Sequence, residues 1–340
     1  MRIYLIALLA VATVACSGKV NEPAEINEVV EVPPLCKVIP EGEVNLPEDE
    51  GPHSEDVEWW YWTGHLQDEE GNWYGFEHVF FQFDYNGSTI LMAHHAITDE
   101  ALRTHNYDVE FGFNSGVTDT NPGFSMTLGS MQAEGALGQD TIHGEIEGRV
   151  LDLEMVATKA PVLQHGNGYH DYNFGGYTYY YTRPRMKATG TMLIGDKKLS
   201  VSGTAWFDHQ WGALNDAVSV GWDWFALQLD DQREIMLFNL REDGGDVLAG
   251  GSLTEADCQT SELDPSSVTI TPLGTWHSDE SGCTYPMGWT LTVDGMELTI
   301  TPLMKEQELI NPSQTYWEGA AIISGDATGR AYIELTGYCP

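Results

Sequence analysis

From residue 57 to the end of the chain, apolar and polar residues alternate in short runs. In the segment 73–85, WYGFEHVFFQFDY, one face carries Val79, Phe81, Phe83 and Tyr85, and the other carries His78, Phe80, Gln82 and Asp84. A period of two is the pattern of a β-strand. Turn-forming residues separate the runs at 68–72, 85–88, 194–198, 242–246 and 293–296. Many short strands joined by such turns predict an all-β fold of sandwiches or barrels.

A weak internal repeat indicates that the β region contains two similar units. Trp60-Tyr61-Trp62 leads through Leu66-Gln67 to an acidic turn, and Trp222-Asp223-Trp224 leads through Leu227-Gln228 to another acidic turn. We therefore predict two β-barrel domains, over 52–215 and 216–340. Both segments are long enough for an ordinary domain.

The first residues are typical of an export signal. Met1-Arg2 is followed by an apolar run over 3–14 and then by Ala15-Cys16. This run is too short to span a bilayer as a helix, so we predict a lipoprotein signal peptide over 1–15. Cys16 resembles the acylated cysteine of a bacterial lipobox, and its acyl chains would anchor the mature protein to a membrane, by resemblance the outer membrane. The alternative is ordinary cleavage near Ala15 and free secretion.

Residues 16–51 are acidic, rich in proline and poor in aromatic residues. Such a stretch buries too little apolar surface to order itself. We predict an extended, disordered tether that spaces the folded domains from the membrane.

The whole chain is strongly acidic, with 52 acidic residues against 15 basic ones and a formal charge of −37. The resulting potential repels nucleic acid and anionic lipid headgroups, so neither is a predicted partner. A solvated acidic surface is the simplest interpretation of this charge.

Four cysteines remain once Cys16 is assigned to a lipid anchor. An exported protein meets an oxidising compartment, and four cysteines allow three pairings. We favour a local Cys258–Cys283 bond and a Cys36–Cys339 bond that ties the two ends together.

The sequence lacks the common motifs of nucleotide and metal chemistry. It contains no P-loop, no G-x-G-x-x-G after a strand, no H-E-x-x-H and no G-x-S-x-G. His94 and His95 are neighbours on a predicted strand and point to opposite faces, so they do not readily share a metal. His165 and His170 lie in a polar loop segment, and we interpret them as solvated. We predict no metal and no cofactor.

The block AWFDHQWG, at 205–212, places an acid beside a histidine among aromatic residues. In an extended strand, Asp208 shares a face with Trp206, and His209 shares the other face with Phe207. An aspartate held among aromatic residues loses hydration, so its pKa rises and it can act as a general acid. His209 could bond to it, orient a water or share its proton. The alternative is a structural pair, with His209, Arg183 or Arg185 as the partner of Asp208.

Asp223 offers a second candidate acid. It shares a predicted strand face with Phe225, Leu227 and Leu229, at the end of an otherwise apolar stripe. We therefore include it with Asp208 and His209 as a candidate catalytic residue.

Aromatic residues are abundant enough to line a deep apolar cavity. A pocket of this kind usually combines apolar walls with a few polar groups. The candidates for ligand binding are Trp60, Trp62, Tyr180, Trp206, Trp211, Trp222 and Trp224. The alternative is that these side chains fill the cores of two barrels.

Six sequence blocks together resemble the AttH-like family, which includes the hydroxyneurosporene synthases or carotenoid 1,2-hydratases. They are EWWYWTGHL (58–66), YYTRPRMKATG (180–190), GTAWFDHQWG (203–212), GWDWFALQL (221–229), YWEGA (316–320) and YIELTGYC (332–339). The similarity extends from about residue 52 to the C-terminus. It implies two lipocalin-like β-barrel domains packed together, a larger hydratase-type one and a smaller C-terminal one.

The resemblance also implies a chemistry. The carotenoid members add water across a terminal carbon–carbon double bond without a metal or organic cofactor: an acid protonates the alkene, and water captures the cation. By position, Asp208, His209 and Trp211 match the Asp-His-x-Trp block of the family, and Asp223 and Tyr180 match less closely. Tryptophan faces would stabilise the developing cation. Fold and motif do not fix the substrate, and an anchored, acidic chain is a poor match for a pigment enzyme.

Two hypotheses follow. In the first, an exported, membrane-tethered lipoprotein binds a hydrophobic lipid- or isoprenoid-like ligand and performs cofactor-free hydration or hydrolysis through Asp208 and His209. In the second, the chain is a non-enzymatic carrier or accessory lipoprotein of an ABC-type exporter. Some relatives are encoded beside ABC-type permeases, which makes such a permease the expected partner.

Overall fold

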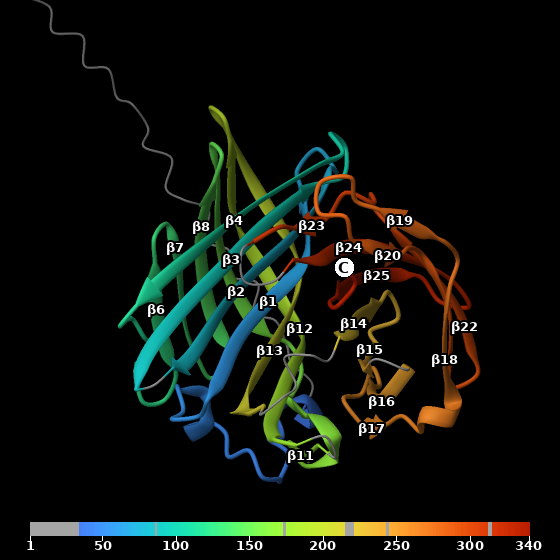
Figure 1. Cartoon of the computed structure of the whole chain (residues 1–340), viewed down its shortest axis with the longest axis horizontal. Coiled ribbons are helices and arrows are strands. Elements are labelled where there is room, and N and C mark those ends of the chain that lie inside the picture. The colour runs from blue at the N-terminus through green and yellow to red at the C-terminus, as the bar shows by residue number, and fades with distance from the viewer. Residues whose placement is uncertain (1–33, 86, 173–174, 215–220, 243–244, 312–314) are drawn as a thin grey trace, which may run out of the picture. The chain divides into compact units, whose positions relative to one another are not determined.

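Two curled antiparallel sheets form the folded part of the chain (Figure 1). The computed structural model describes residues 34–340, apart from 86, 173–174, 215–220, 243–244 and 312–314. The helices among these residues are short 3-10 turns: η1 (Pro34–Lys37), η2 (Glu48–Glu50), η3 (Gln164–Gly166) and η5 (Pro265–Ser267). The all-β prediction of two lipocalin-like barrels is confirmed.

The N-terminal barrel is formed by the first sheet. Its main path runs β4-β3-β2-β1-β13-β12-β9-β8-β7-β6-β5, and β10 and β11 pair with β12. The strands are β1 (Val57–Asp68), β2 (Trp73–Tyr85), β3 (Ser88–Asp99), β4 (Thr104–Phe113), β5 (Thr118–Asp119), β6 (Phe124–Leu128), β7 (Met131–Ala136), β8 (Gln139–Ile146), β9 (Arg149–Ala157), β10 (Val162–Leu163), β11 (Tyr169–Asp171), β12 (Tyr177–Ile194) and β13 (Lys197–Ala213). The strand predicted over 73–85 is β2.

The C-terminal barrel is formed by the second sheet. Its main path runs β17-β16-β15-β14-β25-β24-β22-β21-β18, and β23 pairs with β24. The strands are β14 (Gly221–Leu229), β15 (Glu234–Glu242), β16 (Gly245–Thr254), β17 (Thr260–Glu262), β18 (Val268–Pro272), β21 (Trp289–Val293), β22 (Met296–Pro302), β23 (Glu308–Leu309), β24 (Tyr316–Gly325) and β25 (Gly329–Leu335). A separate hairpin joins β19 (Thr275–His277) to β20 (Thr284–Pro286). The predicted domain boundary at 215/216 lies outside the described residues and stays a prediction.

Each barrel encloses its own apolar core, because alternate residues of every strand point inward. The N-terminal core contains Trp60, Trp62, Phe76, Phe80 and Phe207. The C-terminal core is built around Phe225, Trp289 and Trp317, with the aliphatic residues of β14, β15 and β25. Many of the aromatic residues therefore belong to the two cores, as the alternative interpretation of these residues predicted.

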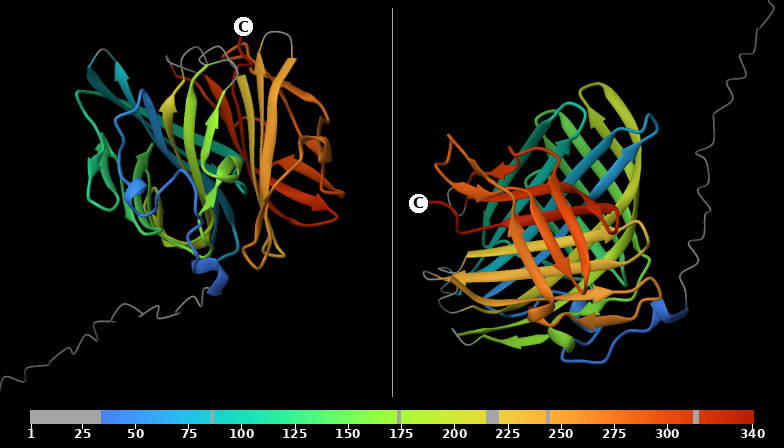
Figure 2. Two further views of the ribbon diagram at one scale, coloured as in Figure 1. Left: turned by 90° about the horizontal axis from the view of Figure 1, so that it is seen from below. Right: turned by 90° about the vertical axis from the view of Figure 1, so that its right-hand side faces the viewer.

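A third apolar cluster joins the two barrels, and we call it the seam. Its buried members come from both sheets: Tyr61, Val79, Tyr180 and Trp206 from the first, and Trp224, Ala226 and Met236 from the second. Figure 2 shows the two curled sheets side by side. At another point of contact Gly75 allows β2 to approach β24, since a Cβ atom there would lie only 2.6 Å from the Cβ of Ala320.

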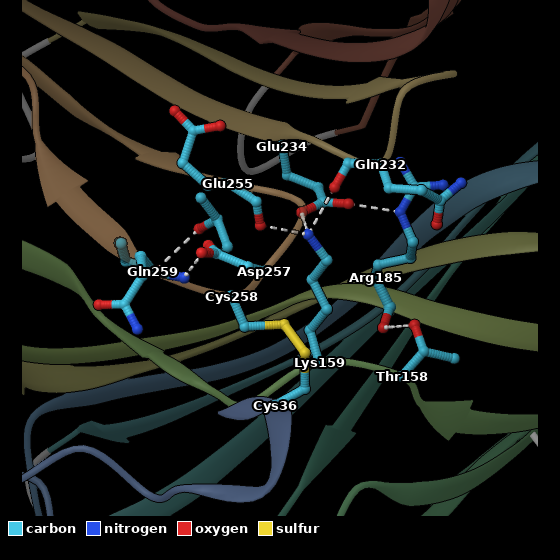
Figure 3. The surroundings of a disulfide bond; sticks show 12 residues. Cys36, Thr158, Lys159, Arg185, Gln232, Glu234, Glu255, Asp257, Cys258 and Gln259 are labelled. Atoms are coloured by element: carbon cyan, nitrogen blue, oxygen red, sulfur yellow. Dashed lines mark hydrogen bonds and ion pairs between the residues drawn. A yellow bond between two sulfur atoms is a disulfide. The ribbon is translucent and has the colours of Figure 1, made fainter. Parts of the chain in front are cut away.

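A buried ion triad also crosses between the barrels (Figure 3). Glu234 on β15 pairs with Arg185 on β12, and its other carboxylate oxygen lies 2.7 Å from Lys159 Nζ. Lys159 also donates to the main-chain oxygens of Gln232 and Glu255. All three charged side chains are buried or nearly so, which makes the triad a specific link between the barrels.

Part of the predicted tether belongs to the folded body, so the prediction of disorder over 16–51 is wrong for residues 36–51. Cys36 is disulfide-bonded, Val44 packs into the N-terminal core, and Glu50 is buried against Arg183. The segment runs along one end of the barrels (Figures 1 and 2). The acidic composition of the segment as a whole gave no indication that these few residues are buried. Residues 16–33, with Cys16, and the signal peptide lie outside the described residues.

The disulfide bonds join Cys36 to Cys258 and Cys283 to Cys339. The favoured pairings, Cys258–Cys283 and Cys36–Cys339, are therefore wrong. Cys258 lies in the turn between β16 and β17, beside η1 (Figure 3), whereas the segment of Cys283 lies against the last residues, with Thr284 N–H bonded to Tyr338 O. Cys258 and Cys283 are therefore not bonded to each other, although they are close in sequence. Two disulfides are typical of an exported, oxidising environment.

None of the short helices among the described residues has the length and apolar character that a membrane-spanning helix needs.

Candidate functional site

Asp208 and His209 are consecutive on β13, but their side chains lie on opposite faces of the sheet. Asp208 is opposite Tyr61 on β1 and points into the seam, and His209 is opposite Trp60 and points into the N-terminal barrel. The predicted assignment of faces is confirmed. A hydrogen bond between the two side chains, one of the options considered for His209, is not formed, because strand alternation separates them.

Asp208 is 3% exposed and is surrounded by hydrogen-bond donors. Its Oδ1 atom accepts from Thr182 Oγ1 at 2.6 Å and from Trp206 Nε1 at 2.9 Å, and its Oδ2 atom accepts from Tyr180 OH at 2.8 Å. Burial raises the pKa of Asp208 to about 7, although these three hydrogen bonds act to lower it. A substantial fraction of this carboxyl therefore holds its proton at neutral pH.

Neither candidate arginine is the partner of Asp208. Arg183 pairs with Glu50 inside the N-terminal barrel, and Arg185 pairs with Glu234 in the ion triad. The alternative of an Asp–Arg pair at this strand end is wrong. The Asp208 carboxyl instead sits in a neutral setting of hydroxyl and indole groups.

Indole rings surround the Asp208 hydrogen-bond network. Trp224 Nε1 donates to Tyr180 OH at 3.3 Å. The Trp224 ring meets Trp206 edge-on at 6.0 Å and Tyr61 edge-on at 5.4 Å between centroids. A protonated acid among indole rings has the composition needed to protonate an apolar ligand and to stabilise a cation formed from it.

A second carboxyl, on the C-terminal barrel, is close enough for the charge of Asp208 to affect its pKa. Burial raises the pKa of Glu334 on β25 to about 7, a hydrogen bond from Trp222 acts against this, and the negative charge of Asp208 adds to it. The seam therefore offers two acids that titrate near neutral pH.

Two further glutamates lie buried where the barrels meet. Tyr61 OH donates to Glu318 Oε1 at 2.5 Å, and Tyr316 OH donates to Glu77 Oε1 at 3.0 Å. Burial raises the pKa of Glu77 to about 8 and that of Glu318 well above its usual range, and the charge of Glu77 adds to the second shift. Burial therefore favours the protonated form of both groups.

On the other face of β13, His209 belongs to a cluster that the sequence analysis did not predict. His209 Nε2 and His53 Nδ1 each lie 2.7 Å from Glu58 Oε1. Burial alone would lower the pKa of His53, but hydrogen bonds to Asp49 and Glu58 raise it to about 9. Burial would raise the pKa of Glu58, and its two histidine partners lower it instead. We call His53, Glu58 and His209 the His209 cluster.

The His209 cluster is the one group of three metal-ligand side chains found among the described residues. No metal site was predicted from the sequence, because these three residues come together only through the pairing of distant strands. Glu58 opens the first aromatic block and alternates with Trp60 and Trp62, which is the only sequence signal that it faces the interior. His53 lies two residues beyond the end of the predicted tether, at the start of the predicted N-terminal domain.

Asp223, the third predicted catalytic residue, lies apart from both sites. It pairs with Arg241 and accepts a hydrogen bond from Tyr338 OH at 2.8 Å. The predicted stripe is confirmed, since Phe225, Leu227 and Leu229 point into the C-terminal core. The structure therefore does not bring Asp223 together with Asp208 or His209 on one face.

The predicted ligand-binding aromatics divide between the two faces. Tyr180, Trp206, Trp222 and Trp224 lie at the seam with Asp208. Trp60, Trp62 and Trp211 lie inside the N-terminal barrel on the face of His209. The seam residues missed by the sequence analysis are Thr182, Glu77, Glu318 and Glu334, and no local signal separates them from other strand residues.

A cavity of about 170 Å³ lies next to the seam rather than within it. Phe238 lines the cavity and also packs against the seam cluster. His165, Glu262 and Leu263 form other parts of its wall. His165 stacks on His170 and burial lowers its pKa to about 4, so the prediction of a solvated loop histidine is wrong for His165.

Comparisons with known proteins agree on the family and the fold. A family model described as AttH-like matches residues 37–338. A crystal structure of an AttH protein from Nitrosomonas europaea is 29% identical with a TM-score of 0.80, and the match covers 89% of this chain and 99% of that one. Kievitone hydratase from Nectria haematococca is 18% identical with a TM-score of 0.71, and that match covers 89% and 97% of the two chains. No curated protein sequence matches this chain significantly.

Proposed function

The chain belongs to the AttH-like family, and from this premise we propose that it is an exported hydratase that adds water to a carbon–carbon double bond of a lipid- or isoprenoid-like ligand. The ligand binds at the seam, and Asp208 is the acid. The observation that carries the proposal is the buried Asp208 carboxyl, whose pKa is about 7 and which lies among indole rings. The hydratase named among the similar structures supports the same reaction class by fold alone.

The proposed reaction needs no cofactor. Asp208 transfers its proton to one alkene carbon, and the positive charge forms on the more substituted carbon. The faces of Trp206 and Trp224 stabilise this cation. A water molecule attacks it and returns a proton to Asp208, so that H and OH are added and the acid is regenerated.

The hydroxyl groups around Asp208 suit this proton cycle. Trp206 Nε1 can only donate, and it fixes one carboxyl oxygen as an acceptor. Tyr180 and Thr182 carry hydroxyls that can donate to the carboxylate or accept from the carboxylic acid. Both protonation states of Asp208 are therefore hydrogen-bonded.

Binding requires the seam to open, since its aromatic members are closely packed. Phe238 and Trp222 are two of its four partly buried members, and Phe238 also lines the neighbouring cavity. We propose that the ligand enters from this side. A carrier of an ABC-type exporter would bind in the same place without turnover.

The test is turnover of isoprenoid alkenes in D₂O by the full-length protein in detergent, with deuterium in the product read by mass spectrometry. Asp208→Asn should abolish hydration. Asp140→Asn is the matched control, because Asp140 is also a buried aspartate bonded to an indole but lies inside the N-terminal barrel. Ligand binding without turnover in the wild type would identify a carrier, and equal turnover in Asp208→Asn would remove the role of Asp208.

The membrane anchor is a separate part of the proposal. Cys16→Ser should yield protein that carries no acyl chains and no longer partitions into detergent. Unchanged partitioning of this variant would contradict the anchor and leave the seam proposal intact.

A further inference from the structure

The His209 cluster has the composition and placement of a transition-metal site. It contributes two imidazole nitrogens and one carboxylate oxygen, and these atoms all lie within 4.8 Å of one another. His53 comes from the segment before β1, Glu58 from β1 and His209 from β13. Ligands from three separate parts of the chain therefore converge on one point.

The sheet register explains how this convergence arises. Trp60 pairs with His209, and Glu58 pairs with Trp211 on the same two strands. Residues two apart on a strand share a face, so Glu58 and His209 are diagonal neighbours inside the barrel. The N-terminal segment then places His53 above them, where its ring stacks on Trp211 at 4.0 Å.

Hydrogen bonds and a neighbouring carboxylate orient two of the three ligands, His53 and Glu58. Asp49 Oδ1 lies 3.7 Å from His53 Nε2, so that His53 presents Nδ1 to the centre, and Asp49 is itself held by Asn45 N–H. The second oxygen of Glu58 accepts from His53 N–H at 2.8 Å. A carboxylate behind a ligating histidine is a recurrent feature of metal sites.

The cluster is buried on one side and accessible on the other. The side chains of Glu58 and His209 are 1% and 0% exposed, and that of His53 is 21% exposed. Three protein ligands with one accessible side are characteristic of zinc sites that keep an open coordination position. Imidazole donors favour zinc and neighbouring transition metals over calcium and magnesium.

We propose that His53, Glu58 and His209 bind one divalent transition-metal ion, with Zn²⁺ as the best match and an open position toward solvent. The ion would separate the three ligands, which now contact one another, and would fasten the N-terminal segment to the mouth of the barrel. This site lies on the opposite face of β13 from Asp208, so the inference does not depend on the proposed hydration.

The test is metal binding by the untagged full-length protein after treatment with a chelator. Titration with ZnCl₂ followed by calorimetry should give one site per chain, and CoCl₂ should give the visible absorption of a bound Co²⁺ ion with nitrogen ligands. His53→Ala and Glu58→Gln should each abolish stoichiometric binding. Asp49→Asn should weaken it by about 10- to 100-fold, as expected for a group that orients a ligand.

The control is His143→Ala. His143 lies within reach of two carboxylates, Glu145 and Asp152, at the surface of β8 and β9, but among the described residues it belongs to no group of three metal-ligand side chains. This variant should bind like the wild type, and circular dichroism should show that all variants fold. If Glu58→Gln fails to fold, His53→Ala decides alone, because His53 lies outside the strands. The absence of stoichiometric Zn²⁺ and Co²⁺ binding in the wild type, or unchanged binding in His53→Ala, would overturn the proposal and leave an ion-paired structural cluster.

Discussion

Asp208 and His209 are adjacent in sequence but belong to different sites, one at the seam between two barrels and one inside the N-terminal barrel. A single strand therefore supplies an acid to one environment and a potential metal ligand to another. The two environments can be tested independently, because a substitution on one face leaves the partners on the other face in place.

Removal of one donor to Asp208 should shift the pH dependence of turnover. Activity that needs protonated Asp208 falls as the pH rises through about 7. The hydrogen bond from Thr182 lowers this pKa, so Thr182→Val should move the fall to higher pH by about one to two units, since a hydrogen bond to a charged group is worth about 1.5–3 kcal/mol. A pH–rate profile measures the shift.

Thr178→Val is the control for this prediction. Thr178 is a buried threonine of the same strand that bonds to Tyr172 and Gln210 instead of Asp208. A shift of equal size in both variants, or a shift of Thr182→Val to lower pH, would contradict the assignment of Asp208 as the acid.

The buried glutamates should make the stability of the folded protein depend on pH. The folded pKa of Glu77 is about 8, above its ordinary value of 4.5. The folded state therefore holds a proton that the unfolded state has lost over this range, and the stabilisation is present below about pH 4.5 and is lost as the pH rises to about 8.

Glu77→Gln removes this titration while it keeps the shape of the protonated side chain. Its free energy of unfolding, relative to the wild type, should rise between pH 5 and pH 8 in denaturant titrations. Glu70→Gln, at an exposed position beside Lys197, should show no such trend. A relative stability of Glu77→Gln that stays flat with pH would argue that Glu77 is ionised in the folded protein.

Loss of one cation from the ion triad should destabilise the link between the barrels. Arg185→Met leaves Glu234 with less compensation in a buried position, and breaking such a pair costs about 3–5 kcal/mol. Arg233→Met breaks an exposed pair with Asp231 and should cost less than about 1 kcal/mol. Similar midpoints for the two variants in urea would be incompatible with a buried triad.

The Cys36–Cys258 bond should stabilise the N-terminal segment on the C-terminal barrel. Its removal in Cys36→Ala with Cys258→Ala should cost about 2–5 kcal/mol, as is typical for a native disulfide. Peptide mapping without reduction should yield linked Cys36–Cys258 and Cys283–Cys339 peptides. Linked Cys258–Cys283 peptides would show that the pairing differs in the mature protein.

Much of the fold could be predicted from local patterns. The alternation in 73–85 defined a complete strand, and the alternation in 205–212 placed Asp208 and His209 on the correct faces. The apolar stripe that begins at Asp223 was also correct. These features depend only on the period of a strand, which the sequence displays directly.

The sites themselves depend on contacts between distant segments. Glu58 meets His209 only because β1 pairs with β13 in one particular register. The charge of Asp208 affects the pKa of Glu334 only because β25 of the C-terminal barrel packs against β1 of the N-terminal barrel. The composition of residues 36–51 predicted disorder, since average charge hides a few buried anchors such as Val44 and Glu50. The prediction of the disulfide pairing was wrong because the pairing also depends on contacts between distant segments.

The most direct test of the central claim is the titration of the Asp208 carboxyl itself. ¹³C labelling of aspartate, with the signal assigned by its loss in Asp208→Asn, reports the protonation of this group by NMR across pH 4 to 9. A midpoint near 7 is predicted, since burial outweighs the three hydrogen bonds. A midpoint near 4 would show an ionised, structural carboxylate and would contradict the acid role proposed for the seam.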